Sequence, residues 1–212
     1  METPLDKARR DPESMKARIL TAARRMFGEY GFHGTTTRMI ATKVGIDIST
    51  LHYHWGNKKD LYEAVILDIN HDLRQKLNRV EKQIHGRPLG ERIEISIDQI
   101  ADYLFGHPEI PNLILYRYFG RTREKEGLDF IVPEFISDIV RSMGLSTDGE
   151  VASSRAMLEV LTIMNSIYGF ISGANFFMPM VNLRKKEYVA MVKETLKFMY
   201  VLPFAQNEGR TR

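Results

Sequence analysis

Apolar residues recur at intervals of three and four positions along nearly the whole chain, a spacing that predicts amphipathic α-helices. We find no strand-like alternation of useful length, no internal repeat and no low-complexity segment. Turn residues divide this pattern into successive helices, at about 12–31, 37–44, 48–55, 58–84, 89–105, 110–119, 128–143, 150–178 and 185–202. The sequence therefore predicts an all-α fold. The first of these helices is expected to bury Ile19, Leu20, Ala23, Phe27 and Tyr30.

Residues 35–61 predict two short helices joined by a tight turn, followed by the start of a third. Thr36 can cap the first helix, because its oxygen accepts an N–H group that has no partner within the helix. Gly45 follows that helix, where a left-handed conformation is needed. Asp47 can cap the second helix, and Gly56 ends it.

The second short helix has two different sides. At roughly 100° per residue, its packing side holds Ile48, Leu51, His52 and Trp55. The opposite side presents Ser49, Thr50, Tyr53 and His54. A recognition helix in the DNA major groove needs this division, since donors, acceptors and small apolar groups read base edges. A three-helix core fragment with a solvated polar face has the same pattern.

The residues of this segment and of the helix before it favour the first alternative. The run ILTAARRMFGEYGFHGTTTRMIATKVGIDISTLHYHWGNKKDLYEAV, from Ile19 to Val65, resembles the N-terminal DNA-binding domain of the TetR family of bacterial transcriptional regulators. It covers about a fifth of the chain, and three helices match in order and spacing. The family usually has Tyr at the position of His52 and Phe at the position of Trp55.

The resemblance implies a set of DNA contacts. They fall at the start of the helix 37–44, along the recognition helix and at the start of the helix 58–84, on Thr37, Arg38, Ser49, Thr50, His52, Tyr53, His54 and Lys58. Lys58 is expected to hold a phosphate together with the N–H groups of its helix. The distribution of charge agrees, because residues 1–60 carry 11 Lys and Arg against 7 Asp and Glu.

The N-terminal residues have two interpretations. Arg9, Arg10, Lys16 and Arg18 can form a flexible basic arm, and residues 1–11 can equally be a solvated, disordered tail. The first residues are charged throughout and have no apolar core, so we expect no signal peptide there.

Residues 160–181 contain no charged side chain over 22 positions. We interpret this run as a core or dimer helix, not a membrane span, because it contains Asn165, Ser166, Ser172 and Asn175. Gly169 and Gly173 would allow a second helix to approach closely. In the family the last two long helices pair with their copies, which predicts a homodimer through residues 150–202.

Aromatic residues and methionines in the second half predict an adaptable apolar ligand pocket, lined by Leu104, Phe105, Tyr116, Tyr118, Met164 and Tyr168. Any of them can equally be a core residue. Arg117, Arg121 and Arg123 either bind an anionic ligand or form a solvated helix end.

Signals for catalysis are absent. The chain has no cysteine and none of the common nucleotide-binding, hydrolase or zinc-protease motifs, so we expect no catalytic residue and no cofactor. Asp68, His71 and Asp72 share one helical face at a spacing that metals use, but a solvated surface cluster explains them at least as well.

Together these observations predict a helix–turn–helix DNA-binding domain at residues 1–60 and a helical ligand-binding and dimerisation domain at 61–212. As the resemblance implies, the expected protein is a cytoplasmic, dimeric regulator that binds a near-palindromic double-stranded DNA operator and acts as a repressor released by a small molecule. One alternative is an all-helical enzyme or metal-binding protein whose N-terminal helices are only structural. A third is a dimeric adaptor that has lost DNA contact.

Overall fold

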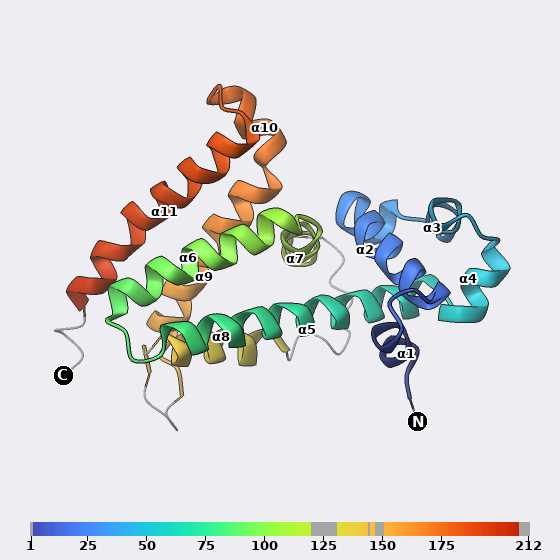
Figure 1. Cartoon of the computed structure of the whole chain (residues 1–212), viewed down its shortest axis with the longest axis horizontal. Helices are drawn as coiled ribbons and strands as arrows, with labels where there is room; N and C mark the ends of the chain where they lie inside the picture. The colour runs from blue at the N-terminus through green and yellow to red at the C-terminus, as the bar shows by residue number, and fades with distance from the viewer. Residues whose placement is uncertain (1, 120–130, 144, 147–150, 208–212) are drawn as a thin grey trace. The chain divides into compact units, whose positions relative to one another are not determined.

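The structure is a computed structural model that describes residues 2–119, 131–143, 145–146 and 151–207. Within these ranges all regular structure is helical, which confirms the predicted all-α fold (Figure 1). The chain divides into two compact units. The first comprises Met1–Leu73 and Asn112–Phe119, and the second comprises the described parts of 74–111 and 120–212.

Three helices of the first unit form the predicted helix–turn–helix arrangement, α2 (Met15–Gly34), α3 (Thr37–Val44) and α4 (Ile48–Trp55). The Thr36 hydroxyl caps α3 by accepting the backbone N–H of Met39 at 3.2 Å, as predicted. Gly45 ends α3 with φ 77° and ψ 41°, the left-handed conformation that favours glycine. Asp47 is the N-cap residue of α4, although its side chain makes no capping hydrogen bond.

Most of the predicted face of α2 is buried, and Ile19, Ala23 and Phe27 are fully enclosed. Tyr30 is 45% exposed, so the prediction that it is buried is wrong. It precedes Gly31, where φ 68° and ψ 177° take the backbone out of helical geometry, so the regular burial pattern of α2 ends there.

The N-terminal residues are not a disordered tail. Residues 4–10 form the helix α1 (Pro4–Arg10), which begins with a capping box. Thr3 accepts the backbone N–H of Asp6 at 3.1 Å, and the Asp6 carboxylate accepts the backbone N–H of Thr3 at 2.9 Å. Sequence periodicity missed this helix because it is short and buries only Ala8.

The long helix α5 (Lys58–Ile84) runs from the first unit into the second. Its first half buries Leu61, Val65 and Ile69. The first unit therefore extends to Leu73, beyond the boundary expected at residue 60, because these side chains are part of its core.

The helix α7 (Glu109–Phe119) also contributes residues to the first unit. The Tyr116 hydroxyl donates to the backbone carbonyl of Glu29 at 3.3 Å. The Tyr116 ring lies 3.6 Å from the position that a Cβ on Gly31 would occupy.

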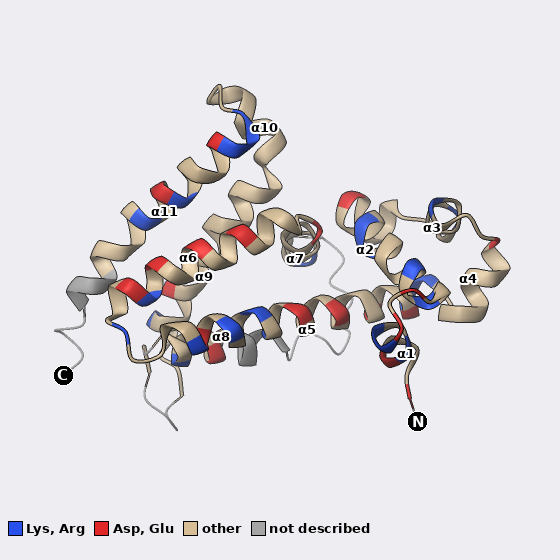
Figure 2. Cartoon of the chain, in the orientation of Figure 1, with Lys and Arg blue, Asp and Glu red and all other residues tan. Residues whose placement is uncertain are grey.

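The second unit contains the remaining helices, α6 (Leu89–Gly106), α8 (Ile131–Ser142), α9 (Ser154–Ser172), α10 (Ala174–Met180) and α11 (Lys185–Asn207). Helices α6 and α11 pack along each other (Figure 1). Both carry charged residues (Figure 2), and ion pairs join the two helices. Lys193 lies 2.8 Å from Asp102, and Lys197 lies 2.6 Å from Asp98. The start of the helix predicted at 128–143 falls partly outside the described residues.

The single helix predicted at 150–178 is two helices, and that prediction is wrong. Helices α9 and α10 meet at Gly173 at an angle of 75°. Gly173 allows the bend because its missing Cβ leaves room for the Phe177 ring, an atom of which lies 2.3 Å from the ideal Cβ position. Among the described residues, only this bent pair, and no single helix, has the length and apolar composition of a membrane span.

Candidate DNA interface

Helix α4 has one buried side and one open side. Leu51 and Trp55 are 0% and 4% exposed, whereas the opposite side presents Tyr53 with 84% of its surface exposed. Ser49 is also exposed, and Thr50 and His54 are half-buried. Tyr53 contributes a large aromatic ring and a hydroxyl group that the chain itself does not bury. The helix therefore presents polar and aromatic groups that can reach base edges.

No Lys, Arg, Asp or Glu lies on α4 itself (Figure 2). Neutral hydrogen-bonding side chains must supply any recognition by this helix, and flanking elements must supply the positive charge. Arg38 is exposed on the first turn of α3, and Thr37 beside it is half-buried. These two residues remain predicted DNA contacts.

Trp55 holds the end of α4 on the first turn of α2. Its indole N–H donates to the backbone carbonyl of Lys16 at 3.1 Å. A phenylalanine, which the TetR-like pattern usually has here, fills a similar space but cannot make this bond. Trp55 is therefore more than a packing substitute, because it also fixes α4 to a named backbone atom of α2.

The side chain of Lys16 returns to the same end of α4. Its Nζ lies 2.9 Å from the backbone carbonyl oxygen of His54 and 3.3 Å from the Nδ1 of the His54 ring. Burial, followed by the nearby positive charge of Lys16, lowers the pKa of His54. The sequence placed Lys16 in a basic arm and gave no signal for this contact, because the two residues lie 38 positions apart.

His52 is exposed, so its placement on the packing side of α4 is wrong. Its Nδ1 lies 2.6 Å from the carbonyl oxygen of Gly56, which requires that this nitrogen carry the proton. The bond closes the C-terminal turn of α4 and leaves Nε2 available. His52 therefore stays a predicted DNA contact.

The side chain of Lys58 makes its contacts within the first unit. Its ammonium donates to the carbonyl oxygens of Phe32 and Thr35 at 2.9 and 3.0 Å, and lies 4.3 Å from the centre of the Phe32 ring. The Asn57 side chain accepts the backbone N–H groups of Lys59 and Asp60. The N–H groups in the first turn of α5 were expected to face a phosphate. They donate instead to the Asn57 side chain, which caps the helix.

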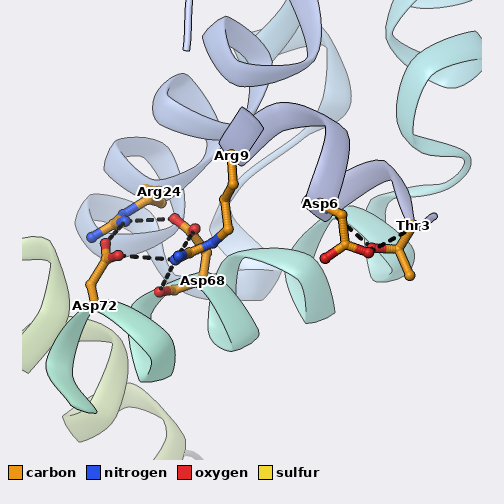
Figure 3. Close-up of polar contacts among 6 residues, drawn as sticks. All are labelled: Thr3, Asp6, Arg9, Arg24, Asp68 and Asp72. Atoms are coloured by element: carbon orange, nitrogen blue, oxygen red, sulfur yellow. Dashed lines mark hydrogen bonds and ion pairs between the residues drawn. The ribbon is translucent and has the colours of Figure 1, made fainter. Parts of the chain in front are cut away.

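A cluster of ion pairs joins α1, α2 and α5 (Figure 3). The guanidinium of Arg9 lies 2.5 Å from Asp68 and 2.9 Å from Asp72, and that of Arg24 lies 2.6 Å from both carboxylates. Burial alone lowers the pKa of Arg24, but the hydrogen bond that it donates to Asp72 and the negative charge of Asp68 raise it overall.

This cluster corrects two expectations. Arg9 does not belong to a flexible basic arm, because it is held against α5. Asp68 and Asp72 are not a solvated surface cluster, because Arg9 and Arg24 pair with both carboxylates and the Asp68 side chain is only 8% exposed. The sequence missed Arg24 as their partner.

The predicted pocket residues fall in both compact units. Leu104, Phe105, Met164 and Tyr168 belong to the second unit, whereas Tyr116 and Tyr118 belong to the first. Leu104 and Tyr168 are buried, and Phe105 packs edge-on against Tyr188 with ring centres 6.2 Å apart. Burial raises the pKa of Tyr118, despite the neighbouring charge of Arg117. Arg121 and Arg123 lie outside the described residues.

The first unit has capped helices joined by a tight turn, and its second helix has one buried and one open side. These features are typical of the helix–turn–helix class of DNA-binding folds. Residues 19–65 match the family model described as bacterial regulatory proteins, tetR family. This match confirms the resemblance of residues 19–65 to the DNA-binding domain of the tetR family.

Individual relatives agree with this assignment. The chain is 30% identical over 102 residues to the HTH-type transcriptional regulator UidR of Escherichia coli K12, covering 48% of this chain and 50% of UidR. It is 31% identical over 109 residues to the HTH-type transcriptional repressor SCO4008 of Streptomyces coelicolor, covering 51% of this chain and 52% of that protein. The matched segments thus span about half the length of these curated relatives.

The fold as a whole is similar to solved structures of transcriptional regulators. One is the regulator FadR from Bacillus subtilis in complex with stearoyl-CoA, with a TM-score of 0.58 and 18% identity. The match covers 85% of this chain and 95% of FadR. At this identity the likeness establishes the fold.

Proposed function

We propose that this protein is a transcriptional regulator that binds a specific double-stranded DNA operator as a homodimer and is released by a small molecule. The observation that carries the proposal is the exposure of Tyr53, 84% of whose surface is open on a helix anchored by fully buried Leu51. The names of the relatives, a transcriptional regulator and a transcriptional repressor, support a role in the regulation of transcription.

Selection from a random duplex pool, followed by titration at several salt concentrations, tests DNA binding. We expect enrichment of a near-palindrome and an affinity that falls steeply with salt, because neutralised phosphates release counterions. Tyr53→Ala should change the preferred sequence more than the affinity for random DNA. A helical enzyme or metal-binding protein would show neither selection nor salt-dependent binding, and an adaptor would dimerise without selecting a sequence.

Dimerisation is supported by the surface of the last three helices. Large apolar side chains are exposed there on Leu158, Phe176, Met180, Met191, Phe198, Met199 and Leu202. A second copy of the chain is the proposed occupant of this surface, within residues 150–202. One recognition helix contacts too few base pairs to select an operator, whereas a two-fold dimer reads two half-sites about 34–36 Å apart or a multiple of that spacing.

Gly169 offers the sharper test of this surface. A Cβ at Gly169 meets no atom of its own chain within 4 Å, whereas one at Gly173 collides with Phe177. Gly169→Glu should therefore convert the dimer to a monomer in light scattering without disturbing the fold of the subunit. Gly173→Glu is unsuitable, because it damages the bend between α9 and α10. A Gly169→Glu protein that remains dimeric would place the interface elsewhere.

The proposed ligand pocket lies in the second unit, around Leu104, Phe105, Met164 and Tyr168. Stearoyl-CoA, which is bound in the FadR structure, combines an apolar chain with an anionic group. Long-chain acyl-CoA compounds are therefore sensible first probes. A compound that raises the melting temperature of the free protein should also dissociate the operator complex, with coupling of about 5–150-fold in affinity.

The switch would act through α5, which is one continuous helix from the first unit into the second. A ligand that prefers one arrangement of this helix lowers operator affinity only by the ratio of its affinities for the two arrangements. DNA must then weaken ligand binding by the same factor. A compound that stabilises the protein but leaves operator affinity unchanged would indicate a ligand pocket that is not coupled to DNA binding through α5.

A further inference from the structure

Lys16 makes an unusual double contact with the end of the recognition helix α4. Its backbone carbonyl accepts the Trp55 indole N–H at 3.1 Å. Its ammonium donates to the His54 backbone carbonyl at 2.9 Å and lies 3.3 Å from the His54 Nδ1. One residue of α2 therefore fixes both the position of the helix end and the ring of a side chain predicted to contact DNA.

The chemistry of this contact determines the tautomer of His54. A lysine ammonium carries three hydrogens and has no lone pair, so it can only donate. Nδ1 of His54 must then accept, and the neutral ring carries its proton on Nε2. Nε2 is separated from Nδ1 by Cε1, and its N–H bond points away from the Lys16 ammonium that Nδ1 contacts. The Tyr53 ring packs beside it, with ring centres 5.2 Å apart.

We propose that Lys16 is a specificity-determining positioning residue, which holds His54 so that its Nε2–H is a fixed hydrogen-bond donor toward DNA. The matching operator group is an acceptor in the major groove, such as purine N7, guanine O6 or thymine O4. The inference rests on the proposed function, since it specifies how α4 reads its operator. Without Lys16 the ring could present either a donor or an acceptor, and discrimination at that base pair would fall.

A direct phosphate contact by Lys16 is the competing role, and it makes different predictions. Loss of a phosphate contact weakens all duplexes alike and lowers the salt dependence of binding. Loss of a positioning residue changes the preference at one base pair. The matched control is Lys43→Met, which removes one exposed lysine from the last turn of α3, a different helix from the one that holds His54.

The first experiment needs no DNA. Long-range proton–nitrogen NMR spectra of the full chain distinguish the two neutral tautomers of each histidine, and His54→Gln identifies the His54 signals by their loss. In the wild type and in the control variant Lys43→Met, we expect His54 to have an unprotonated Nδ1 and a protonated Nε2. Lys16→Met should give a mixture of tautomers. A wild-type ring protonated on Nδ1, or averaged between both forms, overturns the proposal.

The second experiment compares sequence selection by the wild type, Lys16→Met, Lys43→Met and His54→Leu from one random duplex pool. We expect Lys16→Met and His54→Leu to lose discrimination at the same base pair, by about 3- to 10-fold for one hydrogen bond. Lys43→Met should retain it. Unchanged selection by Lys16→Met, or an equal loss on every duplex, overturns the positioning role.

The two experiments separate the possible failures. If the wild type selects no sequence, the proposed function fails and the role of Lys16 in specificity fails with it. If the wild type selects an operator but the expected tautomer is absent, only the Lys16 inference is wrong.

Discussion

Replacing Asp68 with Asn tests whether the ion-pair cluster of Arg9, Arg24, Asp68 and Asp72 holds the first unit together. The variant removes one charge and keeps the shape of the side chain. The Asp68 side chain is 8% exposed and that of Arg24 is 14% exposed, so water screens them little. Removing one partner of a buried pair costs about 3–5 kcal/mol. Asp72 still accepts from both arginines, so we expect the free energy of unfolding to fall by about 2–3 kcal/mol.

Urea unfolding followed by tryptophan fluorescence measures this loss. Trp55 is the only tryptophan of the chain and lies in the first unit, so its signal reports on the unit that contains the cluster. Asp72→Asn is the matched control. Its side chain is 31% exposed, and the same change there should cost about 1 kcal/mol or less.

A double-mutant cycle with Arg24→Met isolates the pair. The double variant should lose less stability than the sum of the losses in the two single variants. Each single variant leaves the other residue of the pair without its partner, whereas the double variant removes both residues. A loss below about 0.5 kcal/mol for Asp68→Asn, or strictly additive losses in the cycle, would refute the buried-cluster argument.

Two further predictions concern the backbone and the recognition helix. Gly31→Ala should lower the free energy of unfolding by about 1–3 kcal/mol, because φ 68° with ψ 177° is a conformation that side chains rarely adopt; an unchanged urea midpoint would contradict this. Burial and Lys16 depress the pKa of His54 below its ordinary 6.5, so the unfolded chain takes up the proton first as the pH falls. Relative to His54→Gln, the wild type should therefore lose stability only as the pH drops below about 6.5, and a constant difference across this window would contradict the lowered pKa of His54.

The parts of the fold that were predictable from sequence depend on near neighbours in the chain. Thr36 and the N–H group that it caps lie three residues apart, and Gly45 directly follows the helix that it ends. The apolar spacing of α5 likewise identifies its buried face from a single helix. Such signals need no knowledge of tertiary contacts.

The features that sequence missed join residues that are far apart. Lys16 meets His54 across 38 positions, and Arg9 meets Asp68 across 59. In the sequence both cations are ordinary candidates for the surface, and only packing shows which carbonyl or carboxylate each one reaches. The break at Gly173 was missed for a related reason, since apolar periodicity continues through the bend while the Phe177 ring occupies the space of a Cβ.

The same reasoning changes what is expected of Lys58. If Lys58 bound a phosphate, its replacement would lower the affinity for every duplex and reduce the salt dependence of binding, the slope of log K against log salt concentration, by about 0.9. Its ammonium instead satisfies two carbonyl oxygens at the end of α2 and the turn before α3, and it lies over the Phe32 ring. Hydrogen bonds from a charged donor contribute about 1.5–3 kcal/mol each, less where the donor is partly exposed.

We therefore expect Lys58→Met to lower the free energy of unfolding by about 1–2 kcal/mol, with an unchanged salt slope for operator binding. Lys59→Met is the control, because Lys59 is the neighbouring, exposed cation at the start of the same helix. Urea unfolding monitored at Trp55 and a salt titration of operator binding give the two quantities on the same proteins. Suppose that Lys58→Met keeps its stability but its salt dependence falls by the amount expected for one phosphate contact. Lys58 then releases these carbonyl groups when DNA binds and contacts a phosphate instead.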